Sequence, residues 1–512
     1  MKKALAMILA AAMLVSLAGC GTAPSGTTSA GGQSTSGSEA KTTLRVGVVE
    51  DPGSFVPYNL NMNSHHTTSL VYQRLFRLDN ENQIAPEMAE SYEFEGDTAL
   101  VIKLKSGIVD SAGNPFTASD ALFSLRLAKD NGAFTLASVD LDASEVVDES
   151  TLRLALLSVD SSLISNLAFL AMVTEKAYND SPDGMVTTPV GTGPYKLVDW
   201  VPGTSVTFTY NENYWGEEPV IKDVEYLIIA EESQRTTALE TGTADIVYNL
   251  GTADVEYVRG TAGLAVEEVE SVRTAGLFFN CSEQSVCNST KLRQAIAHAI
   301  NREAITSVAF GGYAELADSF FSNKCADYTS AYSFEDYYAY DVDLAKQLMA
   351  ESGVPEGTEL ELIIWSATGL KEAAALVQNM LSEIGLTVKI TEYENTLYTD
   401  ILNSSPDKYD LAVNLFLPPS SYSADGLFVC NMWTHMPEEQ NAMYSDYYNQ
   451  AVVTTDMTAY QQLLTECQQK MYEDTPLVSI CHTRYIYGYN SALSVPEFYD
   501  LENLDVTAIS WN

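Results

Sequence analysis

Histidine and basic residues are scarce in this chain of 512 residues. It contains 5 His, and its 27 Lys and Arg stand against 69 Asp and Glu, which gives a formal net charge of −42. Such an acidic chain argues against nucleic acid as a partner, because binding to phosphates depends on Lys and Arg. The few His, together with the lack of any Cys-x-x-Cys pair, also lead us to expect no structural zinc site and no cofactor.

Signatures of common hydrolases are missing as well. There is no G-x-S-x-G turn and no H-E-x-x-H helix. A glycosidase that uses two carboxylates leaves no such signature, since its acids lie far apart in sequence. We therefore expect no enzyme, and a secreted hydrolase stays open as an alternative.

The chain has one long apolar run, and it lies at the start. Lys2, Lys3 and the apolar residues 4–18 lead into Leu17-Ala18-Gly19-Cys20, which has the form of a lipobox. We predict a signal peptide at 1–19, a lipid on Cys20 and a Gly/Ser/Thr-rich flexible tether over 20–40. The mature protein would then be anchored to the extracellular face of the cell membrane, on the periplasmic side where an outer membrane exists. An ordinary signal peptide is the alternative.

Six cysteines remain after Cys20, which allows up to three disulfides. They are Cys281, Cys287, Cys325, Cys430, Cys467 and Cys481. The sequence does not choose among the roughly 15 full pairings. Cys281 and Cys287 would close the shortest loop, so we predict a bridge there first.

The stretch 189–247 organises the chain. Gly191, Gly193 and Pro194 predict a tight turn, and a hairpin follows in which Val206 and Phe208 alternate with Thr residues. A buried strand, a short helix ended by Gly242 and a further strand complete the stretch.

Three blocks of this stretch carry a family resemblance. They are Gly191-Thr192-Gly193-Pro194-Tyr195, Asn211-Glu212-Asn213-Tyr214-Trp215, and Ala238-Leu239-Glu240 with Gly242 and Ala244-Asp245-Ile246. In this order they resemble the family 5 solute-binding proteins of bacterial ABC importers, whose best-known members bind peptides. The resemblance covers most of residues 42–490. It implies an α/β, two-lobed, hinged fold of the periplasmic-binding-protein type with an extra inserted α+β domain.

This resemblance implies a domain layout. Lobe I would comprise 41–85, 189–279 and 483–512, the inserted domain II 86–188, and lobe III 280–482. The two connections between the lobes would lie near Phe279–Cys281 and His482–Tyr485.

Local patterns predict several elements independently. Thr117 and Asp120 form a capping box before a helix. Residues 291–310 read as one amphipathic helix, and 371–384 as another that lies between two apolar strands. Strand, helix and strand with short joints predict a βαβ crossover and parallel pairing. The pair His65 and His66 is expected in a loop, with a structural or solvent-facing role.

The resemblance places the solute between the lobes. Glu50 and Asp51 follow the first strand, where the chain of peptide-binding members passes beside the ligand; a plain turn with solvated acids is the alternative. Tyr248 and Asn249 follow a strand whose equivalent reaches the cleft. Aromatic side chains suit a tolerant cavity, and the remaining predicted contacts are Phe416, Tyr422, Asp425, Trp433 and Tyr485.

The chain departs from the family pattern after Phe416. Peptide-binding members carry an aspartate there that pairs with the terminal ammonium of the peptide, and Pro419 stands at about that position. Asp425 would serve instead, or the solute lacks a free amine. We expect a peptide, with an oligosaccharide, an opine-like compound or a metal chelate as alternatives.

The expected partners are the permease and ATPase subunits of an importer, and the expected state is a monomer. A surface receptor that reports the solute to a sensor is the remaining alternative.

Overall fold

The computed structural model describes residues 41–58, 65–79, 84–132, 136–325, 328–417, 433–496 and 504–512. Residues 41–512 form one compact unit. The predicted signal peptide, Cys20 and the tether lie outside the described residues. Within the part that is described, no helix combines the length and apolarity needed to cross a membrane.

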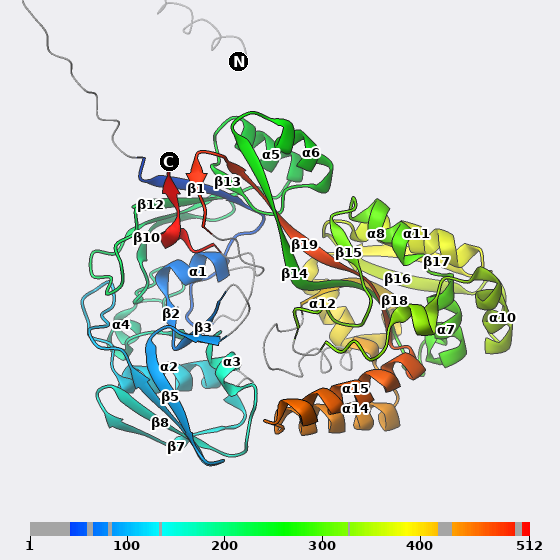
Figure 1. The fold of residues 1–512 in the computed structure, drawn as a ribbon, viewed down its shortest axis with the longest axis horizontal. Coiled ribbons are helices and arrows are strands. Elements are labelled where there is room, and N and C mark those ends of the chain that lie inside the picture. The colour runs from blue at the N-terminus through cyan, green and yellow to red at the C-terminus, as the bar shows by residue number, and fades with distance from the viewer. Residues whose placement is uncertain are drawn as a thin grey trace, which may run out of the picture. The chain divides into compact units, whose positions relative to one another are not determined.

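One large mixed sheet runs through the described unit (Figure 1). Its path of strands is β10 (Tyr195–Val201), β11 (Ser205–Tyr210), β12 (Asp223–Ile228), β1 (Thr43–Val48), β13 (Ile246–Val247), β19 (Leu477–Asn490), β14 (Leu264–Phe279), β18 (Leu411–Phe416), β16 (Glu359–Trp365) and β17 (Thr387–Tyr393). β15 (Ala314–Leu316) pairs with β19 away from this path.

Parallel pairs occur in both halves of the sheet. β1 lies parallel to β12 and β13, and α5 (Glu232–Glu240) connects the latter two. β16 lies parallel to β17 and β18, and α11 (Leu370–Ser382) connects β16 to β17. α11 buries Ala373, Val377 and Leu381 on one side, as its spacing predicts. The predicted βαβ crossover is therefore confirmed.

β14 and β19 join the two halves into a two-lobed α/β fold. They pair antiparallel from Leu264 opposite Asn490 to Phe278 opposite Leu477. The first part of β14 pairs only with β19, and from Thr274 onward it also pairs with β18. A register shift between Glu270 and Thr274 marks this change. The change of neighbours thus falls before the Phe279–Cys281 segment that we expected, because β14 continues as one strand into the second half.

A separate sheet lies between β1 and β10 in sequence. Its order is β5 (Ala89–Glu95), β6 (Ala99–Leu104), β8 (Thr151–Leu156) and β7 (Val139–Asp148), and α2 (Ala118–Asp130) packs on it. Leu100, Ile102, Leu122 and Leu154 belong to its apolar core. The predicted capping box begins α2, where the Thr117 N–H donates to the Asp120 carboxylate over 2.8 Å. α3 (Leu163–Leu167) and α4 (Glu175–Asp180) follow.

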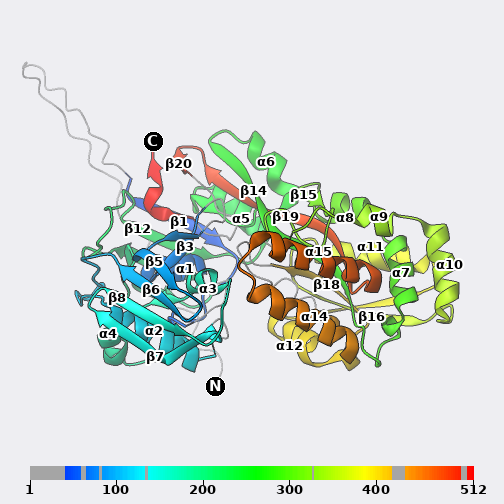
Figure 2. The same cartoon turned by 60° about the horizontal axis from the view of Figure 1, so that its bottom comes forward.

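Helices α7 (Thr290–Ala299) and α8 (Arg302–Ala309) replace the single helix predicted over 291–310. Ile300 is extended, and the side chain of Asn301 caps α8 by accepting from the Ala304 N–H over 2.9 Å. An Asn at this position offers the backbone a new helix start, so the amphipathic stripe continues across a break. Further helices described in this half are α9 (Phe334–Tyr338), α10 (Val342–Ser352), α12 (Asn395–Ser404), α14 (Glu438–Val452) and α15 (Met457–Asp474), and the last two lie together in Figure 2.

The turn at Gly191 and Gly193 packs against α1 (His65–Val71). The Gly193 N–H donates to the Val71 carbonyl over 2.8 Å. A Cβ on Gly191 would lie 2.2 Å from the Val71 oxygen, and one on Gly193 would lie 2.5 Å from the Leu70 oxygen. Neither glycine has a positive φ. The predicted turn thus needs glycine for this close approach and not for unusual backbone angles.

The predicted Cys281–Cys287 bridge is wrong. Cys281, Cys287 and Cys481 are free and buried, and Cys325 and Cys467 are buried as well. Cys281 and Cys287 belong to the apolar core of the second half, and burial raises the pKa of both thiols. Their short sequence spacing reflects two separate core positions. Cys430 lies outside the described residues.

Candidate functional site

The carboxyl ends of the parallel strands define the candidate site. In open α/β sheets, solutes bind beyond these ends. β1 ends just before Glu50 and Asp51, β13 ends before Tyr248 and Asn249, and β18 ends at Phe416. Five of the predicted site residues therefore lie at or just after the ends of three strands.

Asp51 is engaged by its own lobe. Its carboxylate accepts from the Gly53 N–H over 2.8 Å, from Trp200 Nε1 over 3.1 Å and from the Gly203 N–H over 2.6 Å. These bonds fasten the β10–β11 hairpin to the end of β1. Glu50, its neighbour, is exposed.

Tyr248 and Asn249 follow the end of β13, and the Tyr248 side chain is packed inside the first lobe. The Tyr248 ring is 1% exposed and meets the rings of His66 and Tyr487 at 5.8 and 5.2 Å between centroids. Asn249 has a φ of 49°, and its carbonyl accepts from Nη2 of the buried Arg235 over 2.7 Å. Arg235 thus holds the strand exit in shape.

His66 is a residue of this cluster that the sequence did not identify. His65 and His66 lie in the first turn of α1, not in a loop as we expected. The His66 ring contacts Tyr226 at 5.3 Å and is 5% exposed. Burial, with Arg74 and His66 nearby, holds the pKa of His65 well below its usual value, so its imidazole is neutral near pH 7.

Phe416 and Trp433 both pack against Phe278 in the second lobe. Both rings contact Phe278 edge-on, with centroid distances of 5.4 and 5.7 Å. Trp433 Nε1 donates to the Asn403 side chain over 2.9 Å, which fixes the indole. Phe416 is 1% exposed, so it supports this surface more than it forms it.

Trp365 is a further strand-end residue, and our sequence reasoning missed it. It ends β16, and its Nε1 donates to the side chain of the buried Asn414 over 2.9 Å. The sequence could have identified Trp365, because a parallel βαβ unit places the last residue of its first strand at the carboxyl edge of the sheet.

Tyr485, on β19, belongs to the same apolar core as Tyr248. It is 3% exposed, and the Arg273 guanidinium lies 4.6 Å from its ring centroid. Tyr422 and Asp425 lie outside the described residues, so the segment that replaces the family aspartate does too.

Charged side chains gather where β14 and β19 change neighbours. Arg484 donates to Glu268 over 3.2 Å and to Glu315 over 2.7 Å, and Lys324 lies 3.1 Å from Glu270. Nδ1 of His482 lies 3.0 Å from the Thr274 hydroxyl. Burial lowers the pKa of His482 to about 4.

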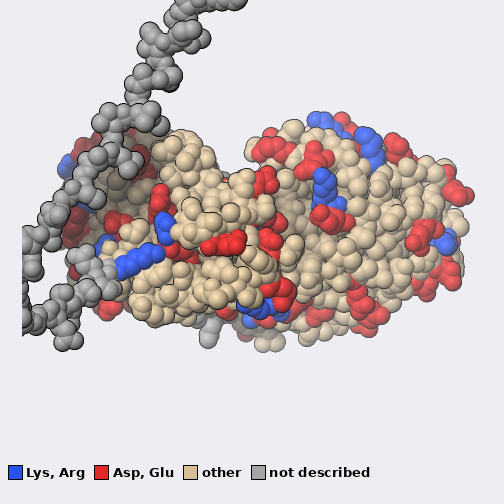
Figure 3. All heavy atoms as spheres, turned by 90° about the horizontal axis from the view of Figure 1, so that it is seen from above, with Lys and Arg blue, Asp and Glu red and all other residues tan. Residues whose placement is uncertain are grey.

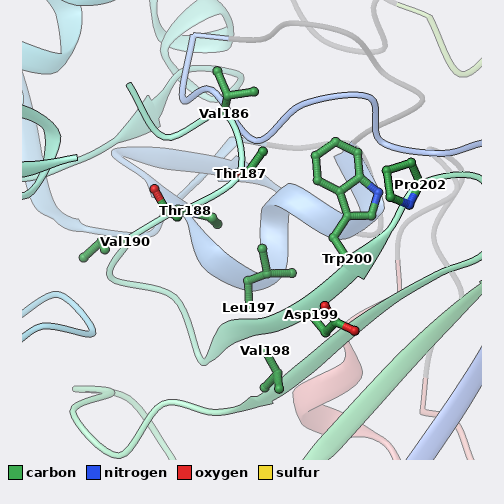
Figure 4. Close-up of a pocket in the computed structure, with 10 residues that line it drawn as sticks. Val186, Thr187, Thr188, Val190, Leu197, Val198, Asp199, Trp200 and Pro202 are labelled. Atoms are coloured by element: carbon green, nitrogen blue, oxygen red, sulfur yellow. The ribbon is translucent and has the colours of Figure 1, made fainter. Parts of the chain in front are cut away.

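A groove of about 570 Å³ lies on β10, outside the predicted site (Figure 4). Val186, Val190, Leu197, Val198, Trp200 and Pro202 provide most of its apolar wall. None of the predicted site residues lines it. Among the described residues, no group of three or more His, Cys, Asp or Glu is placed to hold a metal ion.

Two α/β lobes joined by two long strands are an arrangement that lets lobes close around a solute. Residues 83–435 match the family described as bacterial extracellular solute-binding proteins, family 5. The chain belongs to this family, as its sequence blocks indicate.

Individual relatives agree with this assignment. The glutathione-binding protein GsiB of Pectobacterium atrosepticum is 26% identical over 485 residues, which cover 89% of this chain and 92% of that protein. The structure of DppA from Helicobacter pylori in complex with the peptide STSA is 20% identical with a TM-score of 0.78, covering 92% of this chain and 98% of that one. AgaA from A. tumefaciens, in complex with agropinic acid, is 22% identical with a TM-score of 0.76, covering 92% and 99%. These two structures support the fold.

Proposed function

We propose that this protein is the lipid-anchored, monomeric substrate-binding component of an ABC importer and that it captures short peptides between its lobes. The strand ends of both lobes carry this proposal: β13 ends just before Asn249 in the first lobe, and β16 ends at the half-buried Trp365 in the second. Binding requires no bond to be made or broken, since a solute that favours the closed state is enough to signal occupancy to a permease.

The solutes named for the relatives favour a peptide over other solutes. GsiB is named for glutathione, which is a tripeptide, and DppA holds the peptide STSA. AgaA holds agropinic acid, so an opine-like solute is the second candidate. The lipid anchor rests on Leu17-Ala18-Gly19-Cys20 alone.

Thermal melting of the protein with a library of di- to pentapeptides, glutathione and agropinic acid tests the proposal. We expect a peptide to raise the melting temperature, because a ligand that binds only the folded state stabilises it. A shift with agropinic acid or a sugar and none with any peptide contradicts the peptide assignment. The variant Asp425→Asn then asks whether this carboxylate anchors an amine: it should weaken free-amine peptides and leave N-acetylated ones unchanged.

A further inference from the structure

The inserted sheet domain contacts the second lobe at Ser161. The Ser161 N–H donates to the Val452 carbonyl over 2.7 Å, and the Ser161 hydroxyl lies 3.4 Å from the Ala451 carbonyl. Ser161 lies between β8 and α3, and Val452 is the last residue of α14. The bonded residues are about 290 positions apart in sequence.

The end of α14 has carbonyls that need donors. The last four carbonyls of a helix have no partner within it. Thr454 supplies two donors, its N–H to Ala451 O over 3.0 Å and its hydroxyl to Gln450 O over 2.7 Å. Val452 O accepts from Ser161 instead. The inserted domain therefore completes the C-terminal cap of a helix in the opposite lobe.

The loop that carries Ser161 is built to present its N–H. Asp160 is 8% exposed, and its carboxylate accepts from the Ser138 hydroxyl over 2.6 Å. It also accepts from the Ser162 N–H over 2.9 Å and from the Ser162 hydroxyl over 2.6 Å. These bonds lie within the inserted domain, so they do not depend on α14. A loop fixed in advance loses little entropy when it makes the contact.

A second contact joins the lobes near α5. The Thr368 hydroxyl, just before α11, donates to the Glu232 carboxylate over 2.6 Å. In Figure 1, α5 and α14 lie on opposite sides of the β14–β19 pair. The lobes can therefore rotate about these strands so that α14 moves away from the inserted domain. Such a rotation breaks the Ser161 bonds and does not stretch the hydrogen bond between Thr368 and Glu232.

We propose that the Ser161 loop and the carboxyl end of α14 form a latch that holds the two lobes closed independently of the solute. Its strength depends on the charge at residue 161, because the end of a helix carries a partial negative charge. The latch shifts the ligand-free protein toward the closed state and slows release of the solute.

The test compares Ser161→Asp with Ser161→Lys in the ligand-free protein by small-angle X-ray scattering. A carboxylate at the end of α14 weakens the latch and an ammonium strengthens it, each changing the ratio of open to closed molecules about two- to fivefold. Ser161→Asp should thus have the larger radius of gyration. Ser158→Asp and Ser158→Lys are matched controls, since Ser158 is exposed in the same loop and changes the net charge equally. Ser161→Pro removes the donor and should open the protein furthest.

Equal radii for Ser161→Asp and Ser161→Lys overturn the latch, as does an equally large difference within the Ser158 pair. Hydrogen exchange on the unmodified protein gives a second readout that does not depend on any variant. The Ser161 amide should exchange at least about tenfold more slowly than an unstructured amide. Exchange at the unstructured rate contradicts the proposal.

Discussion

Gly191 lies so close to α1 that no side chain fits between them. We predict that Gly191→Ala costs at least about 3 kcal/mol, because the new Cβ would stand 2.2 Å from the backbone oxygen of Val71 and the backbone would have to move. Thermal and denaturant unfolding measure this loss. Gly260→Ala is the matched control, since a Cβ there meets nothing within 4 Å. A melting temperature of Gly191→Ala equal to that of the control would show that the turn yields easily.

His482 makes stability depend on pH. Burial lowers its pKa to about 4, which is below the value of about 6.5 in an unfolded chain. The neutral form of His482 contributes its full stabilisation of the folded state above about pH 6.5. This stabilisation is lost as the pH falls toward 4, because the unfolded state takes up a proton that the folded state resists. The free energy of unfolding then decreases by about 3 kcal/mol.

The groups that face this imidazole are Thr274, which lies 3.0 Å from Nδ1, and Asp318, which lies 4.0 Å from Nε2, with Glu315 and Arg302 further away. His482→Gln keeps a hydrogen-bonding side chain but takes up no proton. Melting temperatures measured from pH 7.5 to 4 should therefore fall less in His482→Gln than in the unmodified protein. Parallel curves would mean that His482 does not contribute.

At the scale of elements, the sequence predicts those strands and helices that have the same pattern of exposure along their whole length. β11 alternates buried Val206 and Phe208 with less buried neighbours, and α11 buries one stripe. β14 could not be predicted in this way, because the exposure of its residues changes along the strand. Most residues of its first half are partly exposed, and its last six residues are buried. A strand that passes from one lobe into another loses the two-residue period on which the prediction depends.

The residues of the candidate site could be predicted only where their own strand could be predicted. Strand ends such as Tyr248 and Phe416 could be located because their strands could be recognised. His66 could not, since its role depends on a ring contact with Tyr248, which is far away in sequence. Asp51 was placed at the correct turn, but its three hydrogen bonds to the hairpin could only be seen in the structure.

The ion pairs on the strands that join the lobes give a prediction about salt. Arg484 connects Glu268 on β14 with Glu315 on β15. We expect Arg484→Met to lower stability by about 1 kcal/mol in dilute buffer, because partly exposed pairs contribute little and the two carboxylates lose their shared cation. The difference should shrink in molar salt, which screens such pairs. Melting curves at both salt concentrations measure it, and a difference that does not change with salt would point to lost packing instead.

At the scale of the whole molecule, acidic side chains are scattered over the face in Figure 3, with few basic ones among them. This agrees with the excess of 69 Asp and Glu over 27 Lys and Arg. Spread charge of one sign keeps a protein soluble and opposes self-association. It is consistent with the monomer that we propose.

Native mass spectrometry of the freshly purified protein tests the central claim most directly, because closed clefts retain their solutes. We predict one bound molecule per protein, with a fragment spectrum that reads as a short peptide, and its replacement when excess peptide is added. A retained sugar or opine, together with no binding of any added peptide, would contradict the account.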